Sequence, residues 1–163
     1  MDRIVDVAGY IVKKYYEISG EHLDEMKLHK LLYFTQREAL AVTGQKAFDG
    51  VFEGWRRGPV SREVRNAFYD GEIVAPVSNI SEEIQYIANN VILEYGSLTS
   101  WKLSELSHKE LSWQRARKGL APEENGTMPL LIEDIKEDAK KIRPYDHVWD
   151  MYYDEFETGE APA

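Results

Sequence analysis

Apolar residues recur every three to four positions along most of this chain, and this spacing constrains its fold more than any other feature. The clearest case runs from Asp24 to Thr43. One stripe there is formed by Leu28, Leu32, Thr35, Ala39 and Val42, and it is widened by Leu31 and Phe34. Residues at this spacing lie on one face of a helix, so the segment predicts an amphipathic helix facing a core. Asp24 suits the N-cap of this helix and Gly44 its C-cap.

The same spacing predicts further helices between breaks at Gly, Ser and Pro. They cover residues 3–18, 61–69 and 82–95, two short segments around Leu103 and Trp113, and a last segment over 131–142. We expect Asp2 to cap the first of these and Ser61 the helix over 61–69. Residues 45–60 break the pattern with three glycines and Pro59, so Phe52–Arg56 is interpreted as a short strand or an extended loop. The predicted fold is mainly α: one compact domain of about seven helices with a small β element near residues 48–60.

Length and composition narrow the class of protein. The 163 residues suit one domain, which we place over residues 1–144, followed by an acidic tail over 145–163. The chain has no Cys, which excludes disulfides, thiolate zinc sites and a Cys nucleophile. No stretch of about 18 apolar residues indicates a membrane span, and the acidic N-terminus does not resemble a signal peptide. We therefore expect a cytoplasmic protein without a membrane partner.

Charge is unevenly distributed. The net charge is -9, of which -6 lies in residues 145–163, and this acidity disfavours nucleic acid as the main partner. Two segments are basic instead: residues 55–65 and residues 108–118 each carry a net charge of +3. Basic and aromatic side chains together are typical of protein interfaces. The candidate partner-binding residues are Trp55, Arg56, Arg57, Arg62, Arg65, Arg115, Trp149, Tyr152 and Tyr153.

Each of these features also has a plainer interpretation. The basic segments are also explained as solvated helix faces with internal salt bridges. The tail aromatics are equally explained by a final helix that packs on the domain, or by docking of the tail on the chain's own basic segments. The sequence leaves these alternatives open.

Motifs for catalysis, cofactors and metals are missing. The glycines match neither a phosphate loop nor a dinucleotide fingerprint, and no two of the four histidines have the i, i+4 spacing of a helical metal site. A metal site would require residues from distant segments. Ser107, His108 and Glu110 suit acid–base chemistry, but their spacing fits a helix-capping box better. We therefore predict no catalytic residue, no cofactor and no metal.

Three segments together resemble the Panacea antitoxin domain family, which includes the SocA-like and the phage-associated GepA-like proteins. The segments are Lys27-Leu28-His29-Lys30-Leu31-Leu32-Tyr33-Phe34-Thr35-Gln36, Phe52-Glu53-Gly54-Trp55-Arg56-Arg57-Gly58-Pro59-Val60, and Leu106-Ser107-His108-Lys109-Glu110 with Trp113, Ala116 and Arg117. The resemblance covers residues 4–142. It implies a mostly helical fold with a small β element and no enzymatic activity.

The resemblance also implies a role. The expected function is that of an antitoxin, linked to phage defence, that neutralises a protein toxin encoded next door by binding it directly. Some SocA-like members instead act as adaptors that deliver the toxin to a ClpXP-type protease. Two features depart from the family pattern: Arg57 stands where an aromatic residue is common, and the acidic aromatic tail has no counterpart. A DNA-binding autoregulator using the helices over 61–69 and 111–118, and a hydrolase centred on His108, remain alternatives.

The motifs carry expectations about packing. Leu28, Leu31 and Leu32 should lie in the core, whereas Lys27 and Lys30 should be solvated. In the second segment Gly58 and Pro59 predict a turn that directs Trp55 inward, with Val60 in the core and Arg56 and Arg57 outward. Trp113 should be a core residue with a hydrogen-bonded indole.

Overall fold

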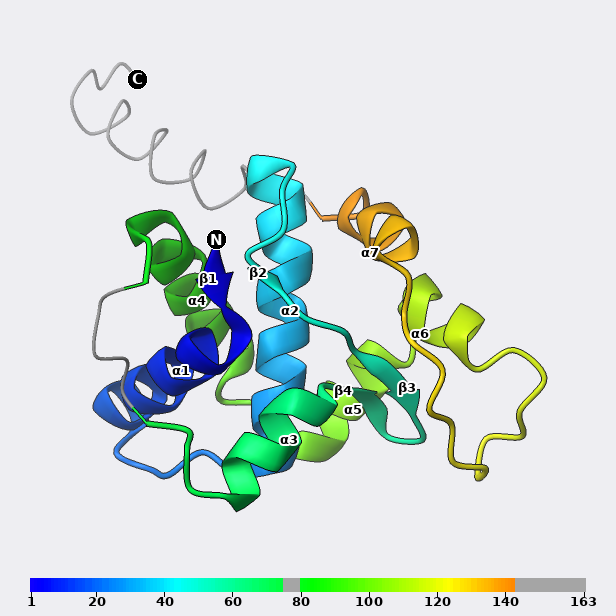
Figure 1. The fold of residues 1–163 in the computed structure, drawn as a ribbon, viewed down its shortest axis with the longest axis horizontal. Coiled ribbons are helices and arrows are strands. Elements are labelled where there is room, and N and C mark those ends of the chain that lie inside the picture. The colour runs from blue at the N-terminus through cyan, green and yellow to red at the C-terminus, as the bar shows by residue number, and fades with distance from the viewer. Residues whose placement is uncertain (75–79, 143–163) are drawn as a thin grey trace, which may run out of the picture.

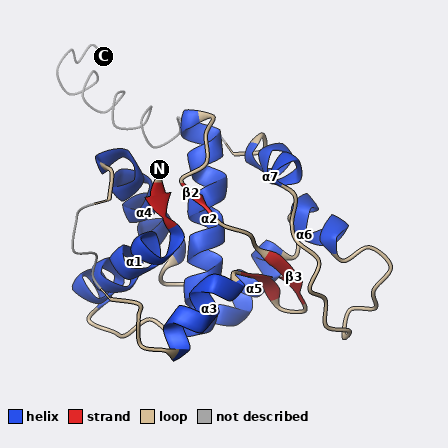
Figure 2. Cartoon of the chain, viewed as in Figure 1, coloured by secondary structure: helices blue, strands red, loops and turns tan. Residues whose placement is uncertain are grey.

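The computed structural model describes residues 1–74 and 80–142, drawn in colour in Figure 1. The helices found there are α1 Ile4–Ser19, α2 Glu25–Thr43, α3 Arg62–Tyr69, α4 Glu82–Tyr95, α5 Ser100–Ser107, α6 Leu111–Ala116 and α7 Ile132–Ala139. The strands are β1 Asp2–Arg3, β2 Phe48–Asp49, β3 Glu53–Trp55 and β4 Gly58–Val60. The predicted fold class is confirmed: a compact, mainly helical domain with small strands (Figure 2).

Helix α2 is the centre of the domain. Helices α1 and α4 pack against one side of it and α7 against another, while α3, α5 and β4 contact its N-terminal half (Figure 1). Every residue from Leu28 to Arg37 is buried, including the polar and charged ones. Leu28, Leu31 and Leu32 are in the core as expected. The expectation that Lys30 is solvated is wrong, because α2 is surrounded by other elements rather than lying with one face in solvent.

Local capping signals in the sequence decide where two helices begin. The Asp24 side chain accepts a hydrogen bond from the Lys27 amide at 2.8 Å, and the Ser61 side chain accepts one from the Val64 amide at 3.2 Å. Helix α1 differs from its prediction. Its N-cap is Arg3, without a side-chain hydrogen bond, and the Asp2 carboxylate instead accepts hydrogen bonds from Ser81 at the start of α4.

The β element consists of two separate pairs of strands. Strands β3 and β4 form an antiparallel hairpin in which Trp55 opposes Gly58, so Arg56 and Arg57 make its turn. This confirms a strand, rather than an extended loop, within Phe52–Arg56. Strands β1 and β2 pair in parallel and connect the N-terminus to the chain after α2, which the sequence did not predict. The hairpin also pairs with the segment before α7 through backbone hydrogen bonds, such as that from the Gly54 amide to the Met128 carbonyl.

Two predictions concern the tail. The boundary at residue 144 and the aromatic residues Trp149, Tyr152 and Tyr153 lie outside the described residues. Within the described residues, no helix has both the length and the apolar character needed to cross a membrane.

Candidate functional site

The three motif segments come together at the β3–β4 hairpin. The Ser104 hydroxyl on α5 donates a hydrogen bond to the Arg57 carbonyl at 2.8 Å. The Trp113 indole N–H on α6 donates to the Trp55 carbonyl at 2.8 Å, which confirms the predicted indole hydrogen bond, although Trp113 is only partly buried. Helix α2 lies beneath the hairpin and contacts β4. Both ends of the turn are therefore fixed by side chains from other helices.

Gly58 is required by this packing. Its φ is +129°, a conformation that residues with a Cβ rarely adopt. A Cβ placed there would also lie 2.6 Å from the Ser107 hydroxyl oxygen and 2.8 Å from Cε of Lys30. The turn thus approaches the lysine side chain closely, which only a glycine permits.

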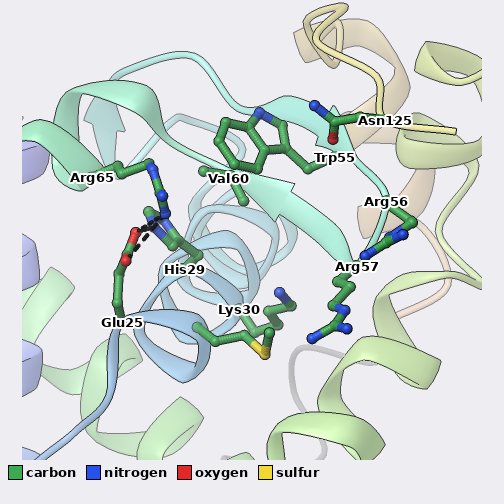
Figure 3. A pocket seen from close by; sticks show the side chains of 10 residues that line it. Glu25, His29, Lys30, Trp55, Arg56, Arg57, Val60, Arg65 and Asn125 are labelled. Carbon is green, nitrogen blue, oxygen red and sulfur yellow. Dashed lines mark hydrogen bonds and ion pairs between the residues drawn. The ribbon is translucent and has the colours of Figure 1, made fainter. Parts of the chain in front are cut away.

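A pocket of about 400 Å³ opens between α2, α3 and the hairpin turn (Figure 3). The side chains that line it are mostly basic or apolar: Glu25, Met26, His29, Lys30, Trp55, Arg56, Arg57, Val60, Arg65 and Asn125. Figure 3 shows Arg56 and Arg57 coming from the turn and Lys30 from the helix beneath it. Arg56 and Arg57 are exposed and Val60 is buried, as predicted.

Lys30 is the most unusual residue of this pocket. Lys30 is 1% exposed, and no described residue forms a hydrogen bond or ion pair with its ammonium group. Burial is the main cause that lowers its pKa from 10.5 to about 8, with a smaller contribution from Arg57, while Asp24 and Glu25 act in the opposite direction. Lys30 is nevertheless mostly charged at neutral pH.

His29 and Glu25 form the opposite wall of the pocket. The Ser61 amide donates to Nδ1 of His29 at 3.3 Å, so the ring proton must be on Nε2, which lies 2.9 Å from the Glu25 carboxylate. Burial lowers the pKa of His29, although the Glu25 carboxylate acts in the opposite direction. Because the pKa is lowered, the imidazole is neutral at pH 7. Glu25 also pairs with Arg65 at 2.9 Å, so its carboxylate is fully engaged.

Trp55 is half-buried at the rim of the pocket rather than in the core. The guanidinium groups of Arg62 and Arg65 lie 5.4 and 5.2 Å from its ring centroid. Its indole N–H donates to Glu53, and Glu53 also pairs with Arg62 at 3.0 Å. The stacked cations stabilise the ring and occupy the space beside it.

A second buried polar cluster supports the site from the far side of α2. The Glu110 carboxylate accepts hydrogen bonds from the Tyr33 hydroxyl at 2.9 Å and from Arg37 at 2.8 Å. Burial lowers the pKa of the Arg37 guanidinium, but Glu110 and Glu38 more than offset this and raise it. The sequence patterns did not predict this cluster, although Tyr33 and Arg37 are one helical turn apart, a spacing that places both on one face of α2.

The capping box expected from Ser107 to Glu110 is wrong. Ser107 is the last residue of α5 and its hydroxyl donates to the Ser104 carbonyl, while the Glu110 side chain makes no cap hydrogen bond. The start of α6 is capped instead by Asp138 of α7, which accepts from the amides of Leu111 and Ser112 at 2.7 and 2.9 Å. A carboxylate 26 and 27 residues away from the two amides therefore performs the role expected of a local residue.

His108 does not line the pocket. Its ring stacks on Trp113 with centroids 4.1 Å apart, and burial lowers its pKa. Its Nε2 atom is buried and has no hydrogen-bond partner in the described part of the chain. The neighbouring Ser107 hydroxyl faces a backbone carbonyl, so the structure forms no nucleophile–base pair between them. Across residues 1–74 and 80–142, no group of three or more His, Asp and Glu side chains is arranged to hold a metal ion.

The structure thus brings together some of the predicted partner-binding residues and separates others. Trp55, Arg56, Arg57 and Arg65 line one pocket, with Arg62 beside them. Arg115 lies outside this pocket and pairs with Asp134 at 2.6 Å. Its neighbour in the second basic segment, Arg117, is buried and donates to the Gly54 carbonyl.

Residues 28–114 match the family described as "Antitoxin SocA-like, Panacea domain". That range contains most of the three motif segments, and it includes the hairpin, Lys30 and the buried Glu110. No curated protein and no solved structure matches the chain.

Proposed function

The chain belongs to the SocA-like family of Panacea antitoxin domains, whose model spans just over half of it, and from this we propose that it neutralises a protein toxin by binding it directly. The toxin is a product of the neighbouring gene, and the complex forms in the cytoplasm. The family match carries this proposal, and the matched range includes Lys30, Arg56 and Arg57 of the basic pocket. The proposed mode of action is stoichiometric occlusion of the toxin.

The hairpin turn supports a contact role for Arg56 and Arg57. Both side chains are exposed, and neither forms an ion pair with a described residue. The turn that carries them is held by the hydrogen bonds from Ser104 and Trp113. A fixed backbone reduces the entropy lost when exposed cations bind a partner. Arginine and tryptophan are also the residues that contribute most at protein interfaces.

The remaining basic side chains are less suited to nucleic acid. On α3, Arg62 pairs with Glu53 and Arg65 with Glu25, and on α6, Arg115 pairs with Asp134. These carboxylates lower the positive potential of the two helices that a DNA-binding role would use. The net charge of -9 acts in the same direction. A protein partner is therefore the better candidate.

Co-expression with the product of the neighbouring gene tests the proposal. Growth arrest by that product should be relieved, and the two chains should co-purify. Arg56→Glu should weaken the complex by about tenfold or more. Lys13→Glu, which changes an exposed cation on α1, is the matched control and should leave binding unchanged. Persistent arrest without a complex would refute the antitoxin function.

The same co-expression separates occlusion from the adaptor role. Under occlusion the toxin persists at full level in the complex. Under the adaptor role the toxin disappears when a ClpXP-type protease is present and persists when the protease is absent.

A further inference from the structure

In the part of the chain that the structure describes, the buried charged side chains form hydrogen bonds or ion pairs, with one exception. Among the described residues, the buried carboxylates Glu110, Asp134 and Asp138 all accept hydrogen bonds. Arg37 pairs with Glu110, and Arg117 donates to backbone carbonyls. Within residues 1–74 and 80–142, only Lys30 is buried with neither a hydrogen bond nor an ion pair to its charged group, and burying a charge without a direct partner is costly. Packing therefore does not account for a lysine at this position.

The ammonium of Lys30 lines the pocket and is not enclosed in the core. Arg56 and Arg57, which are exposed, lie together at the hairpin turn on one side of the pocket (Figure 3). The one carboxylate in the lining, that of Glu25, is held by Arg65 and His29. The pocket thus presents three cations without an available carboxylate from its own lining, which is the chemistry that recognises an anion.

The shape of the pocket favours a carboxylate side chain over a nucleotide. The guanidinium groups of Arg62 and Arg65 lie over the Trp55 ring, where they compete with a base for stacking on the indole. Met26 and Val60 add apolar wall to the same cavity. A volume of about 400 Å³ accepts an acidic side chain together with one or two neighbouring apolar residues.

We propose that this pocket receives an acidic side chain of the protein toxin, whose carboxylate pairs with Lys30 at the base and with Arg57 at the mouth. The proposal rests on the antitoxin function and specifies its contact chemistry. The acidic residue enters as a projecting anchor, and the apolar residues beside it contact Met26 and Val60. Lys30 is then an unfavourable charge in the free domain that becomes favourable in the complex.

Zero-length carbodiimide cross-linking tests this directly, since it joins an amine to a carboxylate that touches it. In the complex with the neighbouring gene's product, peptide mass spectrometry should find Lys30 joined to an Asp or Glu of the toxin. Lys30→Met should weaken toxin binding by about tenfold or more, and Arg57→Gln, an exposed change that does not alter the core, should weaken it too. Lys102→Met, which removes an exposed lysine of α5, is the control.

Three results would overturn the proposal. A complex in which Lys30 joins no toxin carboxylate excludes the contact. A link from Lys30 to the chain's own residues 145–163 identifies the tail as the occupant. Unchanged toxin affinity in both Lys30→Met and Arg57→Gln removes the pocket from the interface.

If no toxin complex forms, the antitoxin function is refuted. A second experiment then still tests whether the pocket binds a carboxylate. A hexaglutamate peptide should bind the full chain saturably and change its tryptophan fluorescence, whereas hexaglutamine should not. Lys30→Met should abolish the response. Saturable binding of inorganic phosphate without binding of hexaglutamate, or no binding of either, contradicts the assigned chemistry.

Discussion

Replacing Lys30 by Met should make the domain more stable, although Lys30 belongs to the family motif. Met has a similar length and reproduces the aliphatic contact with Gly58, but it removes the buried charge. The pKa of Lys30 falls from 10.5 to about 8 on folding. At 1.36 kcal/mol for each pH unit, this difference corresponds to about 3 kcal/mol of stability lost at pH 7.

The effect should depend on pH in a defined direction. Between pH 8 and 10.5 the unfolded chain holds a proton on Lys30 that the folded chain has released. Raising the pH through this window therefore stabilises the wild type. Below pH 8 the variant should be more stable by about 3 kcal/mol, and above pH 10.5 the difference should approach zero. The charged groups acting on Lys30 are Asp24, Glu25 and Arg57, and they are the same in both chains.

Urea unfolding followed by tryptophan fluorescence, at pH 7, 9 and 10.5, measures this difference. Lys27→Met on the same helix provides the contrast. The Lys27 ammonium donates to the Gly96 carbonyl at 2.7 Å and to the Tyr15 hydroxyl at 3.2 Å. Its removal should destabilise the domain by about 1–2 kcal/mol at pH 7. The two lysines are three residues apart, and the substitutions should have opposite signs.

Two results would refute the reasoning. A Lys30→Met chain less stable than the wild type at pH 7 would mean that the ammonium is satisfied in the folded state. A difference that does not change with pH would mean that charge burial is not its cause.

Three further substitutions test the packing around the site, each by urea unfolding. Glu110→Gln removes the negative charge that pairs with a buried guanidinium and should cost about 2–4 kcal/mol; a loss below 1 kcal/mol would show that the pair is dispensable. Gly58→Ala should cost about 2–4 kcal/mol because of its positive φ and its close contacts. By contrast Gly71→Ala, with a positive φ and open space, should cost about 1 kcal/mol. Asp138→Ala leaves two amides of α6 unpaired and should cost about 2–3 kcal/mol. The control Glu137→Ala, at an exposed position, should be nearly neutral. Equal losses in the two variants would contradict the role of Asp138 as the N-terminal cap of α6.

Lys30 connects stability and function in this protein. Residues that serve binding are often unfavourable for the free fold, so a substitution that stabilises the domain and weakens its complex identifies such a residue. The paired measurements on Lys30→Met, one of unfolding and one of toxin affinity, distinguish this role from a purely structural one.

The amino-acid sequence by itself determined the helices and most of their ends. The apolar spacing over 24–43 predicts α2, and its caps at Asp24 and Gly44 lie where expected. These features depend on residues within a few positions of one another, since a cap or a helical stripe is a local interaction. The three motif segments can be recognised in the sequence, and they identify the family. The arginines of the turn were also predicted as partner-binding residues, and they form part of the pocket lining.

The tertiary structure alone decided which polar residues became buried and what they contact. Lys30 reads as a solvated residue because a local pattern cannot show that another element covers the second face of α2. The cap of α6 comes from Asp138 because the packing of α6 and α7 brings a distant carboxylate to the free amides, so Glu110 turns to Arg37 instead. The pocket likewise exists only where the hairpin folds over α2, since its cations come from segments that are adjacent in space and distant in the chain.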